Sequence, residues 1–375
     1  MGNIWADMAS IAFADTVSAR NFAGTNECHG WIGVKYQAHP RDEDSQILLH
    51  VRMLDTENTL QQDALGIVGV NLLYGAFFLH HKPALLVESL LDNLSTARIE
   101  IDMIEFSGIE YRHVDNRLMS LKLVQLGLTG AAVFGAGGEV LQPSAFLRKQ
   151  PILVERGSFR PVTKVNIDML ECAQRRFAID TGAEESSICE LMEITMSNLM
   201  AEGDIDLQDF LARAKLIAAA GKTVLISDYF EYYRLCAYLA RYTTEPIAVT
   251  MGAGSVVELF TERYYQELEG GILEVFGKMF TTDFRIYVYP LRKNGNGRLL
   301  RVENIEMPPE LEKLYGHFVD RGLVLQLDNF DDGVLDIFSR DVLKRIAAGD
   351  VSWESMVPEE IAEVIKQRRF FSYTA

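Results

Sequence analysis

Strand and helix signals alternate through the second half of the sequence, and this alternation restricts the fold more than any other feature. Apolar runs typical of buried strands occupy residues 191–196, 223–227 and 247–251. Segments 207–220 and 229–242 separate them and have the apolar spacing of helices. Strands joined by crossover helices pair in parallel with right-handed connections. We therefore predict an α/β fold with mostly parallel sheets and flanking helices.

The first part of the chain carries weaker signals for another α/β unit. Residues 31–37, 46–54 and 99–106 have the composition of strands, and a helix is expected from the start of the chain to about Ala19. The apolar segment 64–79 is shorter than the ~20 residues that a bilayer requires. It is interpreted as a buried helix whose glycines allow close packing.

Three parts follow from these signals along the 375 residues. Residues 1–145 are expected to form an N-terminal α/β unit, and residues 146–290 a second α/β unit with the parallel sheet. Residues 291–375 are expected to form a helical C-terminal tail packed on the second unit, because helical periodicity dominates there.

The chain is acidic, with a formal net charge of −17. This charge argues against a nucleic-acid surface, since phosphates are bound by clustered Lys and Arg, and against docking on anionic lipid. The expected partners are a small anionic molecule and further copies of the chain. The four cysteines have no metal or redox spacing, so we expect reduced thiols, no metal site and a cytoplasmic protein. No motif identifies a cofactor.

A cationic cluster follows the predicted strand at residues 150–155. Its members are Arg156, Ser158, Arg160 and Lys164. Arginine offers paired donors to planar anions, so this cluster is a candidate site for a phosphate or carboxylate. The alternative is that these cations pair with some of the 53 acidic side chains.

A glycine turn after the strand 247–251 is a second candidate for binding an anion. Gly252, Gly254 and Ser255 open the following helix, where backbone N–H groups attract anions. The turn lacks the remaining residues of a dinucleotide or Walker motif, so a plain strand-to-helix turn is the alternative. Asp115 and Arg117 precede another helix, where a role in substrate binding competes with a helix cap.

Three residues are candidates for acid–base chemistry. Glu27 and His29 lie two positions apart at the start of a strand and so share a face. A polar turn is the competing interpretation. Asp228 ends the strand 223–227, where open α/β sheets gather ligands, although it is also placed to cap the next helix.

Five segments resemble an uncharacterised bacterial family whose members carry inherited names such as nicotinate-nucleotide adenylyltransferase or TonB-dependent receptor. They are NFAGTNECHGW, VDNRLMSLKLVQLGLT, PILVERGSFRPVT, SDYFEYYRLCAYLARYT and FRIYVYP. The sequence has no H-x-G-H nucleotide motif, and no secretory signal is recognised at its start. The resemblance therefore implies membership of that family and no activity.

Together these features predict a soluble enzyme that acts on a small anionic metabolite, either a nucleotide or another phosphorylated or carboxylated compound. The alternative is a non-catalytic homo-oligomeric assembly or a ligand-sensing protein. In that case the helix from about residue 59 and the aromatic segments 229–242 and 284–289 would form subunit contacts.

Overall fold

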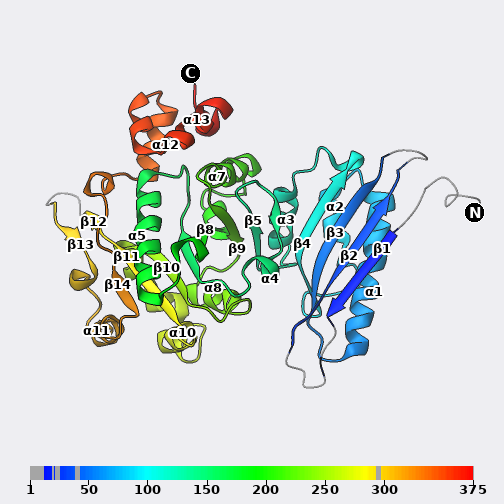
Figure 1. Cartoon of the computed structure of the whole chain (residues 1–375), viewed down its shortest axis with the longest axis horizontal. Helices are drawn as coiled ribbons and strands as arrows, with labels where there is room; N and C mark the ends of the chain where they lie inside the picture. The colour runs from blue at the N-terminus through cyan, green and yellow to red at the C-terminus, as the bar shows by residue number, and fades with distance from the viewer. Residues whose placement is uncertain (1–11, 19–20, 22–25, 39–42, 293–296, 375) are drawn as a thin grey trace, which may run out of the picture. The chain divides into compact units, whose positions relative to one another are not determined.

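The computed structural model describes residues 12–18, 21, 26–38, 43–292 and 297–374. The chain forms two compact units (Figure 1). One comprises Met1–Pro143 with Ile226–Asp228, and the other comprises Ser144–Leu225 with Tyr229–Ala375.

An antiparallel sheet with strand order β1-β2-β3-β4 is the basis of the first unit. Its strands are β1 (Ala12–Ser18), β2 (Cys28–Tyr36), β3 (Ser45–Met53) and β4 (Ile99–Gly108). Alternate side chains such as Ile32, Leu49 and Ile101 face a core that also includes Val68 and Leu72 of the first helix. The helices are α1 (Asn58–Tyr74), α2 (Pro83–Ser89) and α3 (Asn116–Gln125).

The helix predicted from the start of the chain to about Ala19 is wrong for its described part. All seven residues of β1 pair with β2, from Ala12 opposite Lys35 to Ser18 opposite His29. Pairing with an open strand edge satisfies the backbone groups of this segment, and such tertiary pairing overrides local propensity. The rest of the predicted helix lies outside the described residues.

The apolar segment 64–79 is helical, as predicted, but it is not buried on all sides. Helix α1 continues as a π-helical turn, Gly75–Leu79. Val70, Tyr74 and Phe78 are more than half exposed and form an apolar stripe at four-residue spacing. The helix Asn58–Leu79 is long and apolar enough to cross a membrane, although a core helix can meet the same criterion. Of the glycines predicted to allow close packing, Gly75 does so, because a Cβ there would lie 2.7 Å from Leu86 Cγ.

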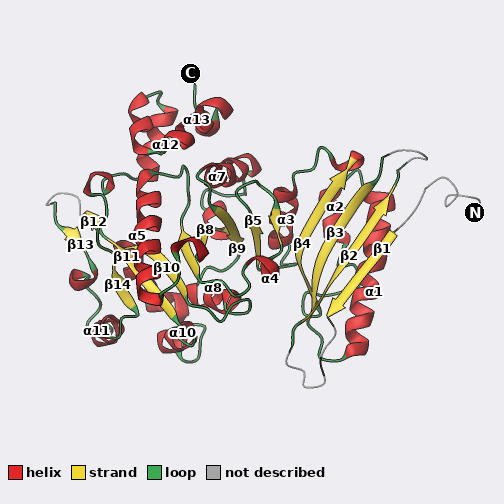
Figure 2. Ribbon diagram, viewed as in Figure 1, coloured by secondary structure: helices red, strands yellow, loops and turns green. Residues whose placement is uncertain are grey.

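An eight-stranded sheet confirms the predicted α/β architecture (Figure 2). Its strand order is β14-β11-β10-β7-β8-β9-β5-β6, and all of it except β5, β6 and the end of β9 belongs to the second unit. The pairs β7–β8, β7–β10, β10–β11 and β11–β14 are parallel, whereas β5 and β6 are antiparallel. The strands are β5 (Ala131–Phe134), β6 (Val140–Leu141), β7 (Ile152–Arg156), β8 (Cys189–Thr195), β9 (Thr223–Ser227), β10 (Ile247–Gly252), β11 (Phe284–Tyr289) and β14 (Val324–Gln326).

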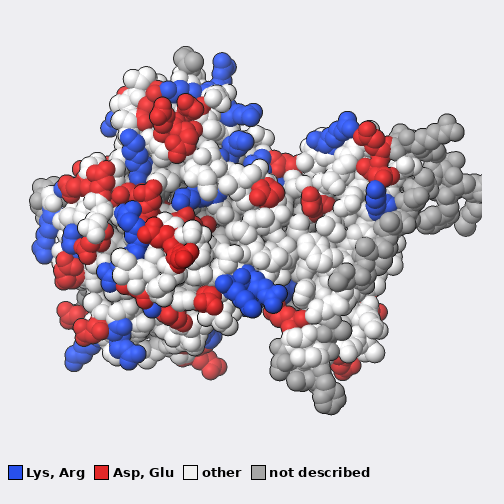
Figure 3. Space-filling view, in the orientation of Figure 1, with Lys and Arg blue, Asp and Glu red and all other residues white. Residues whose placement is uncertain are grey.

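Helices flank this sheet and account for most of the remaining second unit. Those between the strands are α5 (Lys164–Thr181), α7 (Leu207–Ala219), α8 (Tyr232–Leu239), α9 (Ala253–Leu259) and α10 (Gly271–Met279), with the short α4 (Pro143–Phe146) and α6 (Met196–Leu199). The C-terminal part adds an antiparallel pair of short strands, β12 (Leu291–Arg292) and β13 (Leu299–Leu300), and the helices α11 (Glu312–Asp320), α12 (Ser339–Ala347) and α13 (Glu359–Arg368). Acidic and basic side chains are interspersed over the face of the molecule in Figure 3.

Candidate functional site

A change in the direction of strand addition marks one edge of the parallel sheet. After β7 the chain adds β8 and β9 on one side, and then adds β10, β11 and β14 on the other. The carboxyl ends of β7 and β10 therefore lie side by side while their connections diverge. Open α/β sheets bind ligands in the crevice that this divergence leaves.

A pocket of about 250 Å³ lies at this edge, entirely within the second unit. We call it the Arg156 pocket, after the residue that ends β7. Its volume suits a small metabolite rather than a dinucleotide. Its lining comprises Arg156, Gly157, Thr195, Ser197, Asn198, Phe230, Glu231, Tyr232, Ser255, Glu258, Leu259, Tyr264 and Tyr265.

The Arg156 guanidinium is held on several sides by the protein. Its Nε donates to Glu193 Oε2 at 2.7 Å and its Nη2 to Glu193 Oε1 at 3.0 Å. Nη2 also donates to the Tyr229 carbonyl and Nη1 to the Phe230 carbonyl, while the Tyr232 ring lies 4.1 Å from the guanidinium carbon. Because an arginine has five N–H donors, these bonds leave one Nη1 proton for a ligand.

The remaining lining is polar and aromatic but carries little free positive charge. Glu231 and Glu258 contribute carboxylates, and Arg156 is already paired with the buried Glu193. The Thr195 and Ser197 hydroxyls lie 2.8 Å apart, so the two can exchange donor and acceptor roles. Burial raises the pKa of Tyr232 to about 12, which keeps its hydroxyl protonated at neutral pH. The pocket therefore offers hydrogen bonds and ring surface more than a cationic field.

The predicted cationic cluster is divided between this pocket and a neighbouring one. Ser158 and Arg160 line a cavity of about 440 Å³ with acidic residues that include Asp209 and Glu202. Arg160 Nε donates to Asp209 at 2.7 Å, and its Nη1 pairs with Glu202 at 2.8 Å. Arg160 therefore follows the alternative interpretation of the cluster, in which its cations pair with acidic side chains. Lys164 is the exposed first residue of α5 and lines neither cavity.

Of the three residues predicted in the glycine turn, only Ser255 lines the Arg156 pocket. Ser255 lies in the lining, whereas Gly252 ends β10 and Gly254 lies within α9. A Cβ on Gly254 would lie 3.6 Å from Leu291 Cδ2, an ordinary contact, so packing does not demand a glycine there.

The structure places Asp115 and Arg117 at a helix end. Asp115 accepts a hydrogen bond from the Arg117 backbone amide and caps α3, and the two side chains form an ion pair at 2.6 Å. Asp228 is exposed and follows β9, but it does not cap the next helix as the competing interpretation required. The N-cap of α8 is Glu231, because the chain runs on for three further residues before the helix begins.

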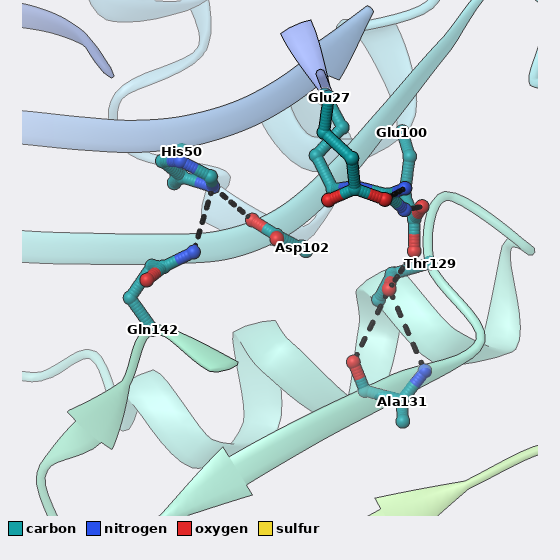
Figure 4. A network of polar contacts seen from close by, with 8 residues as sticks. Glu27, His50, Glu100, Asp102, Thr129, Ala131 and Gln142 are labelled. Carbon is teal, nitrogen blue, oxygen red and sulfur yellow. Dashed lines mark hydrogen bonds and ion pairs between the residues drawn. The ribbon is translucent and has the colours of Figure 1, made fainter. Parts of the chain in front are cut away.

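His29 and Glu27 lie on the face of the first unit's sheet opposite the core, within a chain of polar contacts. His29 Nδ1 is 3.0 Å from His50 Nε2, and His50 Nδ1 is 2.6 Å from Asp102 Oδ1. Glu27 pairs with Arg52, whose other branch pairs with Glu100 (Figure 4).

Sequence reasoning missed most of the residues that complete these two sites. Nothing local links Glu193 or Tyr232 to Arg156, because the fold brings them together from separate elements. A signal for Asp102 was present. The apolar residues of β4 change phase between Ile101 and Ile104, and such a slip indicates a bulge that redirects a side chain.

Glu155 is a buried carboxyl group next to Arg156 in β7, and its side chain lies on the opposite face of this strand. It accepts a hydrogen bond from Asn166 at 2.8 Å, and its other oxygen has no hydrogen-bond partner among the described residues. Burial raises its pKa from 4.5 to about 8. The unfolded chain releases this proton above about pH 4.5 while the folded chain keeps it to about pH 8. The free energy of unfolding therefore falls as pH rises across this window.

Glu155→Gln should remove this loss and make the protein more stable than the wild type at pH 8. With ~1.36 kcal/mol for each unit of pKa shift, we expect a gain of about 2 kcal/mol or more at pH 8 and little change at pH 5. Urea denaturation at both values measures it, with the exposed Glu184→Gln as control. Equal effects of Glu155→Gln at both pH values would contradict the assignment.

The cysteines are unpaired and buried, as predicted. They are Cys28, Cys172, Cys189 and Cys236. Burial raises the pKa of Cys189 to about 12, so this thiol stays protonated at neutral pH. Within the described ranges, no group of three His, Cys, Asp or Glu residues is arranged to hold a metal ion.

In comparisons with known proteins, no family model matches the chain and no curated protein is similar to it. The family resemblance of the five quoted segments therefore stays a prediction.

Proposed function

We propose that the second unit binds a small metabolite in the Arg156 pocket and that the protein is an enzyme acting on this metabolite. The observation that carries the proposal is the position of the pocket at the carboxyl ends of β7 and β10, where the order of strand addition changes direction. The buried, unpaired thiols support a cytoplasmic location.

The lining favours a ligand with a ring and several hydrogen-bonding groups, with at most one anionic group. Phe230 and Tyr264 form an edge-to-face pair with centroids 5.5 Å apart and provide ring surface. A single carboxylate or phosphate would take the remaining Nη1 proton of Arg156. Multiple negative charges are disfavoured, because Glu231 and Glu258 line the same pocket.

Pairs of ligands that differ only in a phosphate test this proposal. The probes are adenosine, AMP and ADP, together with aromatic amino acids and sugar phosphates. We expect at least one of them to raise the melting temperature of the protein, since a ligand at 100 times its Kd stabilises the folded state by about 2.7 kcal/mol. Phe230→Ala should weaken a hit by about tenfold, equivalent to ~1.4 kcal/mol of binding free energy.

The matched control is Leu273→Ala, which removes another exposed apolar side chain outside the pocket. A hit that binds Phe230→Ala and Leu273→Ala equally well lies elsewhere. Tighter binding of ADP than of AMP would contradict the limit of one anionic group. Isothermal titration supplies the affinities.

A homo-oligomeric assembly is the second candidate, and the exposed stripe on α1 favours it. The Tyr74 and Phe78 rings lie 4.9 Å apart, next to Val70, which is 66% exposed. Exposed apolar patches of this kind mark interaction surfaces. The aromatic segment 284–289, also considered for subunit contacts, is instead the interior strand β11, whose side chains other than Arg285 are at most 2% exposed.

Val70→Lys should convert an oligomer to monomers, because a charge in the centre of an apolar contact is costly to bury. Light scattering after size exclusion measures the mass of the wild type and of this variant. Leu126→Lys, at an exposed leucine outside the stripe, is the control. A wild-type monomer at tens of micromolar would rule out a stable oligomer through this stripe.

A further inference from the structure

Three side chains from neighbouring strands of the first unit form a continuous path from its interior to His29. Asp102 and His50 are each 1% exposed, whereas His29 is partly exposed. The contacts run from Asp102 Oδ1 to His50 Nδ1 and from His50 Nε2 to His29 Nδ1. Among the described residues, no hydrogen bond or ion pair is assigned to His29 Nε2, the outer atom of this path.

A bulge in β4 aims Asp102 along this path. His50 pairs with Met103 and Val51 pairs with Ile101, so Asp102 is an extra residue between two regular pairs. Its carboxyl group reaches His50, while its second oxygen is buried without a hydrogen-bond partner among the described residues (Figure 4). The Trp31 ring makes an edge-to-face contact with the His50 ring, with centroids 4.9 Å apart.

We propose that Asp102, His50 and His29 form a proton relay, in which His29 Nε2 acts as a general base toward a hydroxyl group or a water molecule. In the resting state Asp102 is ionised, His50 donates from Nδ1 to Asp102, and His29 donates from Nδ1 to His50. His29 Nε2 then carries a lone pair. This second site goes beyond the Arg156 pocket, and it does not depend on that pocket.

The relay moves three protons by one bond each. The O–H bond of the substrate breaks and an N–H bond forms at His29 Nε2, leaving the electron pair on the substrate oxygen. The proton on His29 Nδ1 moves to His50 Nε2, and the proton on His50 Nδ1 moves to Asp102. The negative charge thus passes from Asp102 to the substrate oxygen, and both imidazoles end neutral.

The surroundings support both states of the relay. Burial raises the pKa of Asp102, which makes this carboxylate a stronger proton acceptor than an exposed one. Burial and the adjacent His50 lower the pKa of His29, so its ring is neutral at pH 7. Gln142 Nε2 lies 3.2 Å from His50 Nδ1, so its N–H group can donate to this nitrogen once the proton of Nδ1 has moved to Asp102. Glu27 pairs with Arg52 beside His29, and Arg52 pairs in turn with Glu100.

Nitrogen-edited NMR of the full-length protein tests the resting state directly, because it reports which nitrogen of each imidazole carries the proton. We expect His29 to be protonated at Nδ1 and bare at Nε2 at pH 7.5. A His29 that is protonated at Nε2 and bare at Nδ1 in the wild type would overturn the proposal.

Asp102→Asn tests the coupling along the path. An asparagine amide that donates to His50 Nδ1 reverses both hydrogen bonds and places the proton on His29 Nε2. Modification of His29 by diethyl pyrocarbonate should then slow by about tenfold, the equivalent of one unit of base strength. Peptide mass mapping follows His29 and, as the control in the same sample, the exposed His113, whose rate should not change.

His29→Gln confirms the identity of the modified peptide. An unchanged rate at His29 in folded Asp102→Asn would contradict the relay. Should Asp102→Asn fail to fold, the NMR measurement on the wild type decides alone.

Discussion

Glu193→Ala should destabilise the second unit by about 3–5 kcal/mol, the range for breaking a buried ion pair by removing one partner. The Glu193 side chain is fully buried and accepts two hydrogen bonds from Arg156. Its removal leaves a guanidinium that is 12% exposed without a counter-charge. Urea denaturation followed by circular dichroism measures the loss.

The matched control for this prediction is Glu202→Ala. Glu202 also pairs with an arginine, but its side chain is 75% exposed, so we expect a loss below about 1 kcal/mol. Replacing both members of the buried pair, as Arg156→Met with Glu193→Leu, should recover much of the stability because no unpaired charge remains. Equal losses in Glu193→Ala and Glu202→Ala would contradict the assigned role of the pair.

Phe260→Ala should cost about 3–5 kcal/mol, because it opens a cavity in an aromatic cluster of the second unit. Phe260 is 1% exposed, and its ring centroid lies 4.7 Å from that of Phe276 and 5.3 Å from that of Tyr315. Removing the ring forfeits its buried area and its edge contacts. Thermal and urea denaturation of the purified variant report the loss.

Phe230→Ala is the counterpart on the wall of the Arg156 pocket. Phe230 is 51% exposed, so its removal should change stability by less than about 1 kcal/mol while weakening ligand binding. The two variants thus distinguish a phenylalanine that stabilises the core from a phenylalanine that binds a ligand. A large loss of stability in Phe230→Ala, or none in Phe260→Ala, would contradict this division.

The parallel sheet could be predicted because its signals are local. Buried parallel strands read as continuous apolar runs, and helices of regular period separate them. The strand β1 could not be predicted in the same way, because its conformation depends on pairing with β2. Sequence period alone does not distinguish a short helix from an edge strand when a partner strand is available.

Only part of the candidate site could be predicted, for a similar reason. Arg156 and Ser255 follow strands at the edge where ligands gather, so position in the sequence identified them. The partner of Arg156, Glu193, is 37 residues away along the chain, and the pocket residues Phe230 and Tyr264 come from later segments. Such partners become apparent only when strand order is known. Arg160 was grouped with Arg156, but the chain turns between them and the two line different cavities.

The bulge at Asp102 also determines how β4 would respond to the deletion of one residue. Ile99 and Ile101 precede the bulge and Ile104 and Phe106 follow it, and all four reach the same core because the extra residue shifts the alternation by one position. Loss of the Asp102 codon would restore regular alternation and leave all four residues on the core face, with His50 still opposite Met103 and Val51 opposite Ile101. The extra position is therefore needed to place the Asp102 carboxylate beside His50, and not to place the core residues around it.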